Sequence, residues 1–128
     1  MKGGRYVVLY IDDDPDILDA LGTVLSAAGY VAIPARSGEE GLRMYKQHRP
    51  DFVIVDMMME EVDAGAHFAK ELKALGNRSP VYMLSSIGDQ VHLSIDPREL
   101  GVDGVFQKPV DLRLLRTTIE TKLGPAAP

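Results

Sequence analysis

The sequence predicts a single α/β domain in which a parallel β-sheet lies between two layers of helices. Two observations predict this class: short apolar runs alternate with segments of helical periodicity, and the connections between them are short. The length of 128 residues suits one domain and is too small for two ordinary ones. Five successive strand–helix units with right-handed crossovers would place helices on both faces of the sheet.

The first strand and helix have the clearest boundaries. Tyr6–Ile11 is an apolar run typical of a buried strand. Asp14 and Pro15 then form an N-cap followed by proline at the first helical position. Apolar residues at helical spacing continue to Ala28, and Gly29 ends the helix.

The second and third strands follow the same alternation. Tyr30–Ala35 is the second predicted strand, and Ser37 has the capping-box spacing that opens a helix. Pro50 interrupts this helix. Phe52–Val55 is continuously apolar and rich in β-branched residues, which favours a strand covered on both faces.

The second half of the chain continues the pattern with one irregular stretch. Phe68–Leu75 carries apolar residues at helical spacing, and Gly76 closes that helix. Val81–Leu84 is the fourth predicted strand. Ile87–Leu100 is less regular, because Pro97 follows a new N-cap residue and makes any helix here short or broken.

The last strand and helix complete the domain. Val105–Gln107 is the fifth predicted strand, and the final helix begins near Asp111. We expect residues 1–5 to be flexible, residues 6–123 to form the domain, and residues 124–128 to be a frayed end or the stub of a linker. The inward-facing residues of the final helix are Leu112, Leu115, Ile119 and Leu123.

Composition excludes several functional classes. The chain has no cysteine, which rules out disulfides, thiolate metal sites and thiol nucleophiles. Its net charge of −5 argues against direct nucleic-acid binding, which needs a basic face. It has no apolar run of membrane-spanning length and no signal peptide, so we expect a soluble cytoplasmic protein without a membrane partner.

Chemically distinctive side chains follow four of the five predicted strands. Asp12–Asp14 follow the first strand, Asp56 the third, Ser85 the fourth and Lys108 the fifth. Ligands of open α/β sheets bind beyond the carboxyl ends of the strands. We therefore expect these side chains to meet in one site.

The acidic residues of this set predict a cation site. Two carboxylates about 4 Å apart repel by roughly 4 kcal/mol at an effective dielectric constant near 20. Asp12, Asp13 and Asp56 can therefore share a site only if they are protonated or neutralised, and carboxylate oxygens suit Mg²⁺. The alternative is that the acidic run only caps the first helix and complements its dipole, which is the role we assign to Asp14.

The remaining residues suit phosphoryl transfer. A carboxylate such as that of Asp56 can accept a phosphoryl group when cations hold the group in line. Ser85 offers a hydroxyl donor, and Lys108 offers a charge that stabilises a developing anion. Each residue taken alone has an ordinary alternative: a solvated acid, a turn serine or a surface lysine.

With these residues in place, the chain resembles a response-regulator receiver domain, the phospho-acceptor module of two-component signalling. The resemblance extends from Tyr6 to about Leu123, and the four motifs that carry it stand in the family's order and spacing. These motifs are Val8–Pro15, Val53–Met59, Val81–Ser86 and Gln107–Pro109. The resemblance implies a flavodoxin-like sheet of strand order 2-1-3-4-5.

The resemblance also implies roles for individual residues. Asp56 would be phosphorylated. Mg²⁺ would bind directly to Asp13, to Asp56 and to the backbone carbonyl of Met58, with Asp12 acting through water. The activity would be that of a regulatory switch rather than an enzyme, limited to self-phosphorylation from phosphodonors and autodephosphorylation.

Two further residues and the partners follow from the same resemblance. Ser85 would bind a phosphoryl oxygen, and Lys108 would pair with Asp56 or the phosphate. The peptide between Lys108 and Pro109 would be cis. The partners would be a sensor histidine kinase or phosphotransfer protein, and an output domain or protein that the sequence does not identify.

Three positions depart from the family pattern. Val105 stands where the family often has an aromatic residue, and the adjacent Phe106 points to the other face of its strand. Glu60 and Glu61 replace the usual Pro-Gly after the phospho-acceptor, and Pro97 interrupts the usual fourth helix. We expect the phosphoryl chemistry to be intact and the route of the output signal to differ.

Two alternatives from other classes are open. A haloacid-dehalogenase-type phosphohydrolase also uses an aspartate after its first strand, and Asp12 with Asp14 resembles its opening motif. However, Pro15 and Asp16 replace the residues that usually follow, and the chain has no room for a cap domain. A pseudo-receiver that only binds partners is the other alternative, and the retention of all the polar positions argues against it.

Overall fold

Five parallel strands form the centre of the computed structural model, which describes residues 1–59, 64–86 and 101–124. Their order is β2-β1-β3-β4-β5, so the predicted topology is confirmed and the fold is flavodoxin-like. The strands are β1 (Val7–Ile11), β2 (Val31–Ala35), β3 (Phe52–Asp56), β4 (Val81–Ser85) and β5 (Gly104–Gln107).

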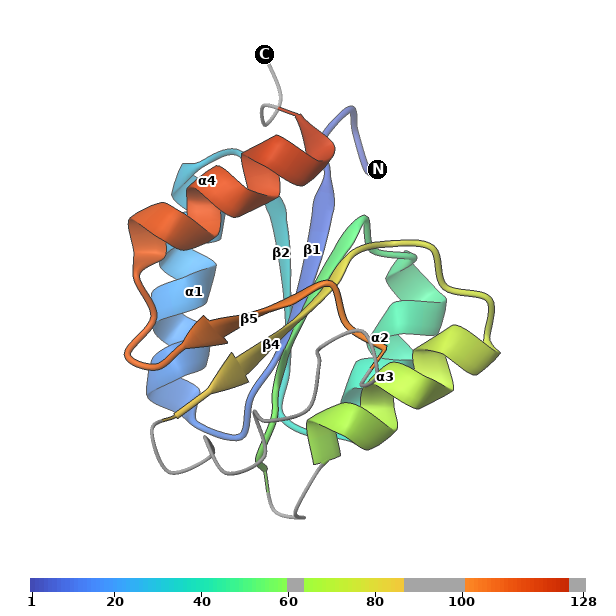
Figure 1. Cartoon of the computed structure of the whole chain (residues 1–128). Coiled ribbons are helices and arrows are strands. Elements are labelled where there is room, and N and C mark those ends of the chain that lie inside the picture. The colour runs from blue at the N-terminus through green and yellow to red at the C-terminus, as the bar shows by residue number, and fades with distance from the viewer. Residues whose placement is uncertain (60–63, 87–100, 125–128) are drawn as a thin grey trace.

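Helices cover both faces of this sheet. Figure 1 shows α1 and α4 on one side of the strands and α2 and α3 on the other. This is the three-layer α/β/α arrangement that the alternating sequence pattern predicts. Within the described residues the helices are α1 (Pro15–Ala27), α2 (Gly38–His48), α3 (Ala64–Ala74) and α4 (Leu112–Leu123).

The central strands are buried on both faces. Successive residues of β1 and β3 point to opposite faces, and all ten residues of these two strands are buried. On one face, Leu18, Leu21 and Leu25 of α1 pack against this surface with Leu115 and Ile119 of α4.

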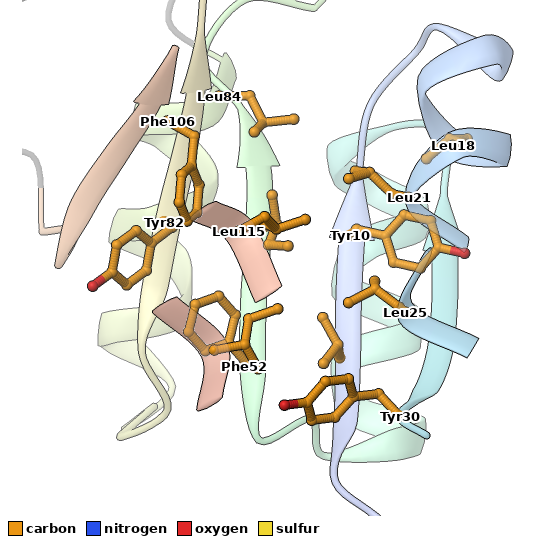
Figure 2. Close-up of a cluster of buried hydrophobic side chains, with 13 residues drawn as sticks. Tyr10, Leu18, Leu21, Leu25, Tyr30, Phe52, Tyr82, Leu84, Phe106 and Leu115 are labelled. Atoms are coloured by element: carbon orange, nitrogen blue, oxygen red, sulfur yellow. The ribbon is translucent and has the colours of Figure 1, made fainter. Parts of the chain in front are cut away.

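Aromatic rings fill much of this first core (Figure 2). Tyr82 stacks between Phe52 and Phe106, with ring centroids 5.1 Å apart in each pair. Offset stacking of this kind adds roughly 0.5–1.5 kcal/mol per pair beyond the apolar area that it buries. Three adjacent strands, β3, β4 and β5, are thereby joined by side chains as well as by backbone hydrogen bonds.

Local capping interactions fix where the helices begin. The Asp14 side chain accepts from the backbone N–H of Asp16, and Ser37 accepts from that of Glu40. Asp111 accepts from the first turn of α4 in the same way. Such caps satisfy backbone donors that have no partner within the helix. All three predicted helix starts are therefore confirmed.

The structure corrects some boundaries. β3 and β4 each run one residue further than predicted, to Asp56 and Ser85, because the neighbouring strands continue the backbone pairing. Leu75 lies beyond α3, which ends at Ala74, and half of its surface is exposed. Its helical spacing with Phe68 and Leu72 had placed it in the helix, but the helix ends one residue earlier.

Some predictions fall outside the described residues. The irregular segment Ile87–Leu100, including Pro97, is one, and Glu60 and Glu61 are another. At the N-terminus the amine of Met1 makes an ion pair with Asp51 at 3.3 Å. Among the helices described, none combines the length and the apolar character that crossing a membrane requires.

Candidate functional site

The site lies where the strands end. The register pairs Ile11 with Val55, Asp56 with Leu84, and Ser85 with Gln107. The residues that end or follow β1, β3, β4 and β5 therefore reach the same edge of the sheet. These residues are Asp12, Asp56, Ser85 and Lys108.

Backbone hydrogen bonds continue past the strand ends and hold this edge together. Asp12 N–H donates to the carbonyl of Ala35 at 3.1 Å, and Met57 N–H donates to that of Leu84 at 2.9 Å. Lys108 N–H donates to the Ser85 carbonyl at 2.6 Å. The functional side chains thus stand on a hydrogen-bonded framework rather than on free loops.

Three carboxylates meet at this edge. One oxygen from each of Asp12, Asp13 and Asp56 lies within 4.8 Å of the others. Asp12 and Asp56 are buried, whereas Asp13 is exposed. Asp12 Oδ1 accepts from the Asp14 N–H at 2.9 Å, and Asp56 Oδ1 accepts from the Met58 N–H at 3.3 Å.

One amine lies among these acids. Lys108 Nζ is 3.1 Å from Asp12 Oδ2 and 3.1 Å from Asp56 Oδ2. Its side chain is one-fifth exposed, so the ammonium is partly accessible to solvent. The peptide between Lys108 and Pro109 is cis, as expected.

Burial and neighbouring charges shift the pKa values of Asp56 and Lys108. Burial and then the nearby Asp12 carboxylate raise the pKa of Asp56 to about 6, although Lys108 and the Met58 N–H oppose this rise. Burial by itself would lower the pKa of Lys108, but the carboxylates of Asp56 and Asp12 outweigh it and raise that pKa. The acids therefore hold more negative charge than the one amine neutralises.

This charge balance fits a divalent cation. Three carboxylates face one ammonium among the described residues, which leaves two negative charges uncompensated. Asp12 Oδ2 is fully buried and has no hydrogen-bond donor in the described structure apart from its ion pair with Lys108. An all-oxygen site with one exposed carboxylate suits Mg²⁺, which takes one or two carboxylates and keeps several waters.

Two predicted site residues, Ser85 and Met58, make fewer contacts with the acid cluster. Ser85 is fully buried at the end of β4, and its hydroxyl donates to the Ser86 carbonyl at 3.3 Å. Met58 is partly buried, and its N–H is the donor to Asp56 described above. The structure brings Asp12, Asp13, Asp56 and Lys108 together. The roles predicted for these four residues, for Ser85 and for the Met58 carbonyl stay predictions.

The sequence reasoning missed one contact. Gly65 in the first turn of α3 donates its N–H to the Met57 carbonyl at 3.1 Å, directly beside the phospho-acceptor candidate. A signal was available, because a glycine in a helical pattern is unfavourable and usually has a packing or functional reason.

The predicted departure at the fifth strand is confirmed. Val105 packs with the core under α2 and α3, whereas Phe106 belongs to the core under α1 and α4. The two residues therefore face opposite sides of β5. No aromatic side chain of β5 lies on the Val105 side in the described structure.

Comparisons with known proteins identify this arrangement. The family described as the response regulator receiver domain matches residues 8–120. The transcriptional regulatory protein GlrR of Escherichia coli is 36% identical over 121 residues, which cover 94% of this chain and 27% of that protein. A probable transcriptional regulator, ycf27, of Guillardia theta is 37% identical over 116 residues, or 91% of this chain and 44% of that protein.

Solved structures agree with these matches. A response regulator receiver domain protein from Clostridium thermocellum has a TM-score of 0.83 at 28% identity and covers 92% of this chain and 94% of its own. The chemotaxis protein CheY4 of Vibrio cholerae has a TM-score of 0.78 at 27% identity and covers 92% of this chain and 98% of its own.

Proposed function

This chain belongs to the response-regulator receiver domain family of two-component signalling, and we propose that it works by accepting a phosphoryl group on Asp56. The observation that carries the proposal is the convergence of three segments on one point: the residues after β1, the end of β3 and the residue after β5. The Lys108 amine lies 3.1 Å from both Asp12 and Asp56, and Asp13 is in the same cluster.

The transfer is a displacement at phosphorus. A carboxylate oxygen of Asp56 attacks the phosphorus of a phosphohistidine or an acyl phosphate, and the bond from phosphorus to the leaving nitrogen or oxygen breaks. The product is an acyl phosphate on Asp56. With a pKa of about 6, the Asp56 carboxyl is mostly ionised at neutral pH, and the ionised form is the nucleophile.

The acid cluster would hold Mg²⁺ during this step. The residues that would bind it are Asp13, Asp56 and the carbonyl of Met58, with Asp12 acting through water. When bound, Mg²⁺ neutralises phosphoryl oxygens and favours the ionised form of Asp56.

Lys108 and Ser85 would stabilise the transferred group. The amine of Lys108 is already beside the Asp56 oxygen, so negative charge that develops on the phosphoryl oxygens is close to a fixed cation. Ser85 ends the neighbouring strand, and a rotation of its hydroxyl would let it donate to a phosphoryl oxygen. Both residues would then read the presence of the phosphate.

The phosphate would act as a switch. It adds about −1.5 to −2 charges, and coupling between two sites in a protein typically amounts to ~1–3 kcal/mol. The chain spans about a quarter to a half of the length of the curated relatives named above. We propose that a histidine kinase or phosphotransfer protein supplies the phosphoryl group and that an output domain or protein responds.

Labelling from an acyl-phosphate donor tests the proposal. Wild-type protein incubated with acetyl phosphate and Mg²⁺ should gain label, whereas Asp56→Asn and wild type in excess EDTA should not. Turnover of small phosphate esters is measured in parallel, because sustained hydrolysis would indicate the haloacid-dehalogenase-type alternative. If wild type gained no phosphoryl group from any donor, the pseudo-receiver alternative would be favoured.

A further inference from the structure

Gly65 stands at a place where glycine has no conformational reason to be. It is the second residue of α3, it is buried, and it is absent from the residues with positive φ. Any residue could adopt its backbone angles, and alanine is the better helix former. The requirement for glycine must therefore come from what lies beside it.

What lies beside it is the backbone of the phospho-acceptor segment. A Cβ placed on Gly65 would be 2.5 Å from the carbonyl oxygen of Asp56 and 2.8 Å from the Cα of Met57. It would also lie 3.0 Å from Cε of Met83. A methionine end can move aside, but the first two atoms are main chain and can move only if β3 or α3 moves.

The contact is attractive as well as close. Gly65 N–H donates to the Met57 carbonyl at 3.1 Å, so the first turn of α3 is bonded to the peptide that follows Asp56. The next N–H along, that of Met58, donates to the Asp56 carboxylate at 3.3 Å. A hydrogen-bonded path of a few atoms therefore runs from Gly65 to the acid cluster.

We infer that Gly65 is a positioning residue for the metal and phosphoryl site. Its missing side chain lets α3 rest on residues 56–58 and fixes the direction of the Asp56 side chain and of the Met58 peptide. The inference rests on the proposed function, which makes these groups the ligands of Mg²⁺. Because Mg²⁺ demands near-ideal octahedral geometry, a small displacement of this segment would weaken binding.

A second glycine provides a matched control. Gly41 in α2 packs on the same face of the sheet, and a Cβ there would lie 2.7 Å from Cδ1 of Ile11 and 3.1 Å from Cε2 of Phe68. Both atoms belong to side chains, and neither belongs to the backbone of residues 56–58. Gly41→Ala should therefore disturb packing without displacing residues 56–58.

The test is a Mg²⁺ titration by calorimetry of wild type, Gly65→Ala and Gly41→Ala, at a temperature where thermal unfolding shows each to be folded. Gly65→Ala should bind Mg²⁺ at least tenfold more weakly than wild type, in the range seen when supporting residues of metal sites are changed. Gly41→Ala should bind within about twofold of wild type, whatever its loss of thermal stability. Equal Mg²⁺ affinities for folded Gly65→Ala and wild type would overturn the inference.

A measurement on wild type covers the case in which Gly65→Ala does not fold. The amide hydrogen of Gly65, which donates to Met57, should exchange several-fold more slowly when Mg²⁺ is added, and the amide of Gly41 should not change. No slowing at Gly65 in protein that binds Mg²⁺ would count against the inference. Wild type that binds no Mg²⁺ at all would instead refute the proposed function.

Discussion

At the scale of single residues, Asp56 is buried with less compensation than its charge requires. Its pKa of about 6 shows that folding favours the neutral carboxyl over the carboxylate. The uncompensated charge destabilises the metal-free protein at neutral pH by an amount on the order of 1–3 kcal/mol. This cost is typical of a functional site, where ionisation is tuned for a reaction.

Replacing this carboxyl should therefore stabilise the metal-free protein. Asp56→Asn is expected to raise the free energy of unfolding by roughly 1–3 kcal/mol at pH 7 in EDTA, because it removes a charge that burial and then the Asp12 carboxylate disfavour. Urea unfolding of the two proteins measures the difference. With saturating Mg²⁺ the difference in unfolding free energy should shrink or change sign. Only wild type keeps the complete set of carboxylates, so Mg²⁺ stabilises it more.

The same comparison has a defined pH dependence. Because the pKa of Asp56 is raised in the folded state, folding takes up a proton between pH 3.8 and about 6. The contribution of Asp56 to stability is thus fully present below pH 3.8 and is lost as the pH rises to about 6. The excess stability of Asp56→Asn over wild type should grow across this window and level off above it. A difference that shrinks with rising pH would contradict the assignment.

Lys108 should separate metal binding from phosphoryl transfer. Lys108→Gln is expected to slow labelling by acetyl phosphate roughly 100-fold or more, because it removes a cation beside the reacting oxygen. The Mg²⁺ affinity of this variant should not fall, because the ammonium that neutralises part of the acid cluster is gone and no longer competes with Mg²⁺. Lys122→Gln on the exposed end of α4 is the control and should label like wild type. An unchanged rate for Lys108→Gln would remove the amine from the mechanism.

The site residues could be predicted from the sequence because they are polar and follow apolar strands. Asp12, Asp56 and Lys108 were predicted to share one edge, and the distances in the structure agree. Gly65 was missed because its importance lies in an atom that it lacks. Only the three-dimensional path of α3 reveals which backbone atoms approach it.

At the scale of elements, the three acidic residues between β1 and α1 have different structural settings. Asp12 and Asp13 belong to the site, while Asp14 caps α1 through the N–H of Asp16 at 2.9 Å. Two of these three chemically identical side chains therefore lie in the acid cluster, and the third caps a helix.

This division can be tested by substitution within the run. Asp14→Ala should lower the free energy of unfolding by about 1 kcal/mol, the usual cost of a lost N-cap, and leave Mg²⁺ affinity unchanged. Asp13→Asn should do the opposite, with little change in stability, because Asp13 is exposed, and a loss of Mg²⁺ affinity of about tenfold or more. Urea unfolding and calorimetry give the two quantities. A loss of Mg²⁺ affinity in Asp14→Ala matching that in Asp13→Asn would refute the division.

Element types could be predicted more securely than element ends. Apolar runs and helical spacing identified every strand and helix that the structure describes, because burial on a sheet face imposes those periods. The ends were less predictable because they depend on neighbours: Ser85 joins β4 through its pairing with Gln107. Leu75 had the spacing of a helical residue, but α3 ends at Ala74 and the Leu75 side chain is exposed.

At the scale of the whole molecule, the architecture separates an apolar centre from a polar edge. Two apolar cores fix the sheet from both sides, and the polar residues collect where the strands end. The strand order could not be derived from periodicity alone, because many orders accommodate five βα units. It came from the family resemblance, and the structure confirms it.

Family membership does not define how a signal would leave this domain. In the described part of the chain, β5 presents Val105 and no aromatic ring to the face under α2 and α3. The two transcriptional regulators named above are longer than this chain, and we propose that the responding element belongs to another segment or another protein.

Mapping the site of phosphorylation tests the central claim most directly. Protein treated with acetyl phosphate and Mg²⁺ is reduced with borohydride, which converts an aspartyl phosphate to homoserine, and the peptides are sequenced by mass spectrometry. The account predicts one modified residue, Asp56, and none when Mg²⁺ is withheld. Modification at Asp12 or Asp13 instead, or an unmodified Asp56 in protein that has bound Mg²⁺, would contradict it.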